Sequence, residues 1–98
     1  MIIHLYTIIK ARVYMGQKEK LIARLRSRPR DLTFGEVETL LGFFSYKLDN
    51  KGRSSGSRVM FVSDVHPPIL LHRPHPGSVL KAYQVRQLTD LLEKEGLI

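Results

Sequence analysis

The spacing of hydrophobic residues changes abruptly near the middle of the chain, and this change restricts the fold more than any other sequence feature. Val37, Leu40, Leu41 and Phe44 are three or four residues apart, as on the buried face of a helix. From Phe44 to Asp49 hydrophobic and polar residues alternate, as in a strand with one buried face. A helix that leads directly into such a strand predicts a mixed α and β structure.

Further helices are expected on both sides of this point. Thr33 and Glu36 have the spacing of a capping box, in which the threonine caps a helix and the glutamate reaches back to it. An earlier helix is expected to end at Pro29, and a last one to stop at Gly96. The predicted helices therefore cover residues 18–28, the hydrophobic stripe after Thr33, and residues 82–95.

Three strands are predicted, over residues 44–48, 57–62 and 69–73. Short connections make them an antiparallel meander. The fold class is α+β, with the order helix, helix, three strands, helix. A three-stranded antiparallel sheet is expected to have helices packed on one face, which leaves the other face available for binding. If the register is favourable, that free face brings Arg58 beside His72.

The chain is basic, and the excess charge lies at one end. All 98 residues together carry a net charge of +7, and residues 1–30 alone hold eight basic side chains and one acidic side chain. This asymmetry indicates a nucleic acid, an anionic membrane or an acidic protein as partner. The alternative is a basic surface without any partner. The length fits a single domain, cysteine is absent, and no apolar run is long enough to span a membrane.

The first fourteen residues have a doubtful status. They lack the leading charge and the cleavage site of a signal peptide, and Met15 begins a more ordinary start. We expect residues 1–14 to be either an upstream extension or an added edge strand, and residues 15–98 to form the single domain.

A glycine- and serine-rich loop precedes the second strand. Residues 52–57 lack the spacing and the lysine of a nucleotide-binding phosphate loop. Lys51, Arg53 and Ser57 are instead candidate contacts for RNA phosphates. The alternative is a plain hairpin loop.

The densest chemical cluster is His72-Arg73-Pro74-His75-Pro76. Two histidines without a third ligand do not make a convincing metal site, so no metal is expected. A neutral imidazole can accept the proton of a ribose 2′-hydroxyl, and Arg73 can stabilise charge on the attacked phosphate. The alternative is a strand end that histidine and proline merely shape. His66, in a proline-flanked turn, and His4 are weaker candidates.

From Met15 onwards the chain resembles the HicA toxins of HicA/HicB toxin–antitoxin pairs. The family has Gly-Ser-His at the start of its second strand, where this chain has Gly56-Ser57-Arg58. A histidine after the family's third strand is followed five residues later by Leu-Lys, as His75 is by Leu80-Lys81. In the last helix Val85-Arg86-Gln87-Leu88 stands in the place of the family's Leu-Arg-x-Ile-Leu.

The resemblance implies a fold like that of double-stranded-RNA-binding domains and a cytoplasmic toxin that cleaves mRNA without a metal or other cofactor. A HicB-like antitoxin would neutralise it, and neither a membrane nor a small-molecule cofactor would be involved. The family's catalytic histidine falls on Arg58, which stays protonated and cannot act as a base. Another histidine must then serve, or the protein binds RNA without cutting it. A non-catalytic RNA-binding module, a degenerate toxin and a protein-binding adaptor are the alternatives.

The candidate catalytic residues are therefore His75, His72 and Arg58. The candidate RNA-binding residues are the basic and hydroxyl side chains near these positions and on the first helix: Lys51, Arg53, Ser57, Arg73, Lys81, Arg86, Lys20, Arg24 and Arg28.

Overall fold

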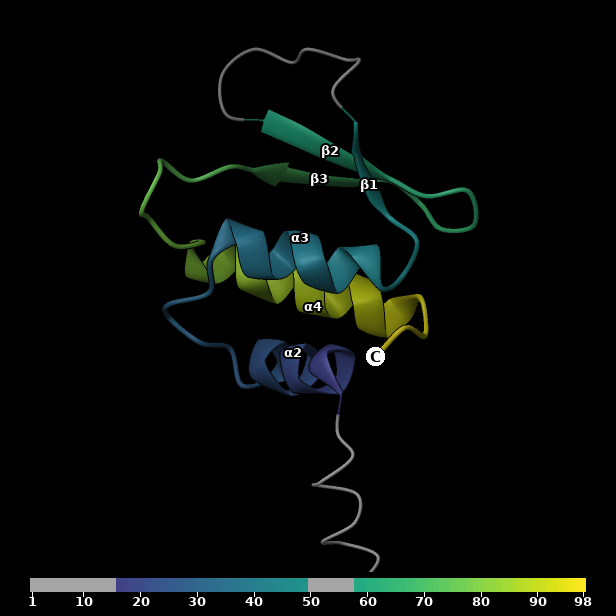
Figure 1. Cartoon of the computed structure of the whole chain (residues 1–98), viewed down its shortest axis with the longest axis horizontal. Coiled ribbons are helices and arrows are strands. Elements are labelled where there is room, and N and C mark those ends of the chain that lie inside the picture. Colours follow the sequence, from purple (N-terminus) through teal and green to yellow (C-terminus); the bar gives the residue numbers. More distant parts are fainter. Residues whose placement is uncertain (1–15, 50–57) are drawn as a thin grey trace, which may run out of the picture.

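The computed structural model describes residues 16–49 and 58–98 (Figure 1). Its fold is α+β, and the order of elements is the predicted one, with helices and strands in the sequence α-α-β-β-β-α. The elements are α2 (Gln17–Arg26), α3 (Phe34–Gly42), β1 (Lys47–Asp49), β2 (Arg58–Val62), β3 (Ile69–His72) and α4 (Ala82–Lys94). In these two ranges no helix is both long and apolar enough to cross a membrane.

The elements form three layers. The strands make one antiparallel sheet in the order β1-β2-β3, with β2 in the centre. Helices α3 and α4 lie on one face of the sheet, and α2 packs against both of them on the side away from the sheet (Figure 1). The prediction that the helices cover a single face is confirmed, and none of the described helices lies on the opposite face of the sheet.

The hydrophobic core lies between the sheet and the helices. Phe61 on β2 and Leu71 on β3 point into it, as do Leu41 on α3 and Leu88 on α4. Leu25 of α2 is completely buried and joins the same cluster. The predicted helical stripes are therefore the surfaces that meet, and burial of these side chains supplies the main stabilisation.

The predicted capping box begins α3. The Glu36 backbone N–H donates to Thr33 Oγ1 at 3.1 Å, and the Thr33 backbone N–H donates to Glu36 Oε1 at 3.0 Å. Both ends of the box are satisfied, so two amide groups that the helix itself cannot pair are bonded.

The first strand starts later than the alternating pattern predicts, at Lys47 rather than Phe44. The residues between α3 and Lys47 form the turn that closes the helix. Ser45 has a φ of 68°, and the Tyr46 N–H donates to the Leu41 carbonyl at 3.1 Å, the closing bond of a Schellman motif. Phe44 and Tyr46 are buried as predicted, but they belong to this turn and not to the sheet.

Candidate functional site

The strand register places Arg58 and His72 opposite each other. Arg58 of β2 pairs with His72 of β3, and Met60 pairs with Leu70. Because successive side chains in a strand alternate between faces, all four residues belong to the free face of the sheet, where each is exposed. Side chains directly opposite each other in antiparallel strands have Cβ atoms about 4.5–5.5 Å apart. The neighbourhood of Arg58 and His72 that the sequence allowed is therefore present.

The rest of the free face carries several apolar side chains, although it is exposed to solvent. Met60, Val62 and Leu70 are 39%, 36% and 46% exposed; Met60 pairs with Leu70, and Val62 follows two residues later on the same face of β2. Lys47 and Asp49 of β1 add charged groups on the other side of β2. The arginine and histidine thus stand at one end of an apolar strip.

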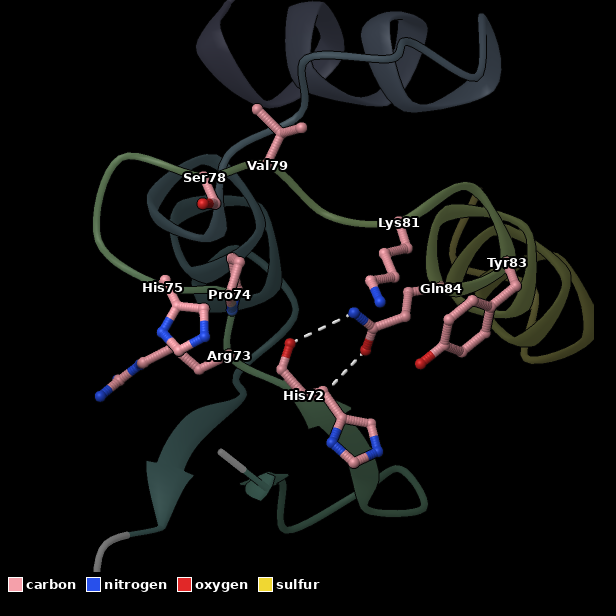
Figure 2. Close-up of a pocket in the computed structure, with 9 residues that line it drawn as sticks. All are labelled: His72, Arg73, Pro74, His75, Ser78, Val79, Lys81, Tyr83 and Gln84. Carbon is pink, nitrogen blue, oxygen red and sulfur yellow. Dashed lines mark hydrogen bonds between the residues drawn. The ribbon is translucent and has the colours of Figure 1, made fainter. Parts of the chain in front are cut away.

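The Gln84 side chain hydrogen-bonds the backbone of His72 (Figure 2). The His72 N–H donates to Gln84 Oε1 at 2.8 Å, and Gln84 Nε2 donates to the His72 carbonyl at 3.2 Å. Since β3 is an edge strand, this amide takes the place of a further strand. The sequence analysis missed Gln84, although its position four residues before Leu88 places it on the buried face of α4.

A hollow of about 530 Å³ opens at this end of β3. His72, Lys81, Tyr83 and Gln84 line it together with the loop that follows the strand. In Figure 2 the Lys81 ammonium and the Gln84 amide converge towards its centre, and the Tyr83 ring lies on the same side as the His72 imidazole. An imidazole, a primary cation and an aromatic ring thus surround one opening.

His75 and Arg73 project away from this group. Figure 2 shows His75 on the other side of the chain from the His72 ring, although both residues line the hollow. The Arg73 guanidinium carbon lies 4.6 Å from the centre of the Phe34 ring, on the helical side of the sheet. The structure therefore brings His72 together with Arg58, and not with Arg73 or His75.

The candidate residues on α2 lie on the opposite side of the molecule from the free face. Lys20 is exposed on α2, which α3 and α4 separate from the sheet (Figure 1). Arg24 bonds internally, with Nε donating to Glu36 Oε2 at 2.5 Å and Nη2 donating to Asp31 Oδ1 at 3.0 Å. Lys51, Arg53, Ser57 and the weaker candidate His4 fall outside the described residues.

Arg28 and Arg86 line a second hollow together with Arg30. It lies between the segment that follows α2 and the first turn of α4, so these two candidates belong to neither the free face nor the exposed surface of α2.

His66 belongs to a separate cluster at the opposite end of the β2–β3 hairpin. Its ring stacks on Tyr46 with centroids 6.0 Å apart, and its Nδ1 lies 3.9 Å from Glu95 Oε1. Burial raises the pKa of Tyr46, the negative charge of Glu95 adds to this effect, and the Tyr46 hydroxyl donates to the Pro67 carbonyl at 2.8 Å. These contacts fasten the hairpin to the end of α4.

The Arg58–His72 end of the sheet has groups suited to phosphate chemistry. A neutral imidazole can accept a hydroxyl proton, and guanidinium and ammonium groups stabilise negative charge on phosphate oxygens. Among the described residues no three histidine or acidic side chains are grouped so as to hold a metal ion. No protein-family model, curated protein or solved structure matches the chain.

Proposed function

We propose that this protein is a cytoplasmic toxin of the HicA kind, which binds mRNA, cleaves it without a metal, and is neutralised by a HicB-like antitoxin. The observation that carries the proposal is the pairing of Arg58 with His72 on the free face of the sheet. The position of the family's catalytic histidine holds an arginine, and the strand register sets a histidine directly opposite it.

In the proposed reaction His72 acts as the base. Its imidazole takes the proton of a ribose 2′-hydroxyl, whose oxygen attacks the adjacent phosphorus and forms a 2′,3′-cyclic phosphate. The bond to the 5′-oxygen breaks, and that oxygen leaves as a hydroxyl after receiving a proton from the imidazolium or from water. Arg58 and Lys81 stabilise the charge that develops on the phosphate oxygens, and Tyr83 offers a ring on which a base can stack.

The antitoxin in this proposal covers the free face of the sheet. A partner placed there would bury Met60, Val62 and Leu70, which are exposed apolar side chains, and would exclude RNA from Arg58 and His72. Neutralisation then needs no change in the toxin itself.

Purified protein incubated with RNA in EDTA tests the proposal. Cleavage is expected to persist in EDTA and to fall about 100-fold or more in His72→Ala, the usual scale for loss of acid–base catalysis. His75→Ala is the matched control, because His75 is also an exposed histidine at the same hollow but projects away from His72. Equal activity of the wild type and His72→Ala, with folding checked by circular dichroism, would contradict the assignment.

A non-catalytic RNA-binding module is the second candidate, and the arginine at position 58 favours it because arginine cannot accept a proton. Arg58→His separates the two functions. Restoring an imidazole is expected to create or raise ribonuclease activity if the site is a catalytic one. A folded, RNA-bound and inactive Arg58→His protein, together with an inactive wild type, would establish the binding module.

A further inference from the structure

Three arginines converge on a second hollow, of about 400 Å³, next to the first turn of α4. Arg28 and Arg30 come from the segment after α2, and Arg86 comes from α4. The remaining lining residues are apolar: Pro29, Leu80, Ala82 and Val85. Within the described part of the chain no acidic side chain lines the hollow, so its wall holds three positive charges and no counter-charge.

The three guanidinium groups also lack partners elsewhere in the described ranges. None of them forms a side-chain hydrogen bond or an ion pair there, in contrast to Arg24, which bonds Glu36 and Asp31. Three like charges around an apolar floor repel one another, and an anion that joins them relieves this repulsion. Guanidinium groups match the oxygens of a phosphate in geometry as well as in charge.

The backbone at Arg28 makes a left-handed turn just after α2. Its φ of 52° lies in the left-handed region, at a helix end where glycine is the usual residue. Ser45 has the same conformation after α3, so the turn at Arg28 serves to carry the chain from α2 to the hollow that Arg28 and Arg30 line.

The two hollows lie on two sides of the same helical turn. Lys81, Tyr83 and Gln84 line the hollow at the end of β3, whereas Ala82 and Arg86 line the arginine hollow. A helix with its side chains is about 10–12 Å across, so the openings are only that turn apart. A strand of RNA that occupies the first hollow can therefore pass round the start of α4 and reach the second.

We propose that Arg28, Arg30 and Arg86 bind a backbone phosphate of the RNA strand whose reacting ribose lies at His72. This inference rests on the proposed function. It adds a second phosphate site, remote from the reacting bond, which positions the strand without taking part in catalysis. Since phosphate contacts carry no base specificity, the site is expected to act on all sequences alike.

The test uses 2′-O-methyl oligouridylates, which lack the attacking hydroxyl and so report binding alone. Affinities of wild type, the double variant Arg30→Gln/Arg86→Gln and the control Arg26→Gln/Lys94→Gln are measured by fluorescence anisotropy over a range of salt concentrations. Arg26 and Lys94 are exposed in the last turns of their helices and line neither hollow, so the control removes the same charge elsewhere. The arginine variant is expected to flatten the dependence of log K on log salt by about 0.7, because one phosphate is no longer neutralised. The control is expected to change it by less than half of that.

The length of the oligonucleotide distinguishes binding at the second site from a general effect of charge. A dinucleotide is too short to reach both hollows, so its affinity should be the same for wild type and arginine variant. Equal losses in both double variants would overturn the site, as would a loss for the dinucleotide equal to that for the longer strand. A larger loss of affinity for polyglutamate than for RNA would assign the arginines to an acidic protein instead. A wild type that binds no RNA would remove the proposed function itself, an outcome distinct from binding that ignores the arginines.

Discussion

Arg24 shows how a residue that the sequence presents as a free basic surface group can be committed to contacts within the protein. Its guanidinium joins Glu36 at the start of α3 and Asp31 just before it, and so fastens α2 to the connection that follows. Lys20, the other α2 residue proposed to bind RNA, is exposed and takes no part in this network.

Substitution at these two positions is expected to have opposite consequences. Arg24→Ala should lower the melting temperature by several degrees, because two carboxylates lose their partner, and should have little effect on RNA affinity. Lys20→Ala should leave the melting temperature unchanged, since its side chain lies on the surface. Thermal unfolding followed by circular dichroism, with RNA binding measured on the same samples, checks both. An Arg24→Ala protein of unchanged stability that has lost RNA affinity would show that Arg24 binds RNA and would contradict its structural role.

At the residue scale, part of the candidate site could be predicted from the sequence. The alternation of β2 and β3 placed Arg58 and His72 on faces that can meet, and only the register was missing. Register depends on how the hairpin turns and on which side chains the helices bury, and neither can be read from one strand alone. The directions of Arg73 and His75 depend likewise on where β3 ends, one residue earlier than predicted, at His72.

At the scale of elements, local signals located the helices well. The capping box at Thr33 and the stop at Gly96, which has a φ of 73°, are both present. The turn at Ser45, which follows α3, was not recognised, because a serine with positive φ has no distinctive sequence signal. The sequence therefore assigned Phe44 and Tyr46 to a strand, although their burial alone was correctly anticipated.

The start of α3 is expected to be sensitive to acid. The hydrogen bond from Arg24 lowers the pKa of Glu36 below its ordinary value of 4.5, burial opposes this shift, and the bonds from Thr33 add to it. A carboxyl group with a lowered pKa in the folded state stabilises the protein above its unfolded pKa, and that contribution is lost as pH falls towards the folded pKa. The free energy of unfolding should therefore decrease as pH drops below about 4.5.

Glu36→Gln isolates this contribution. The glutamine keeps a side-chain oxygen for the capping box but cannot be protonated in this range, so the variant should be less stable at neutral pH and lose less stability on acidification. Urea unfolding of both proteins between neutral pH and about pH 3 provides the comparison. Parallel pH profiles for wild type and variant would show that Glu36 does not carry the acid dependence.

At the scale of the whole molecule, the position of charge along the chain does not coincide with its position in space. The basic excess of residues 1–30 includes all of α2, which α3 and α4 separate from the sheet (Figure 1). Arg58 and His72 belong to the free face of the sheet. Arg28 and Arg30 are the members of that basic segment that reach α4. The number of charges in the sequence indicated an acidic partner. The arrangement of the helices and the sheet in layers determines which of these charges a single bound RNA strand can contact.

The division of the chain at Met15 leads to a prediction about the whole domain. A chain that starts at Met15 retains all of α2, including Leu25, which is completely buried, and the Gly16 carbonyl that accepts the Lys20 N–H at 3.1 Å. Its melting temperature should therefore stay within a few degrees of that of the full chain. Because the truncation removes only the two cations Lys10 and Arg12, the slope of RNA affinity against log salt should flatten by about 1.4 at most.

A chain that starts at Ile22 is the control, because it removes half of α2 along with Leu21, which packs on the core, and should melt far lower. Removal of residues 1–14 that destabilised the protein as much as this control would make that segment part of the domain, as the edge strand or core element that its hydrophobic residues also allow.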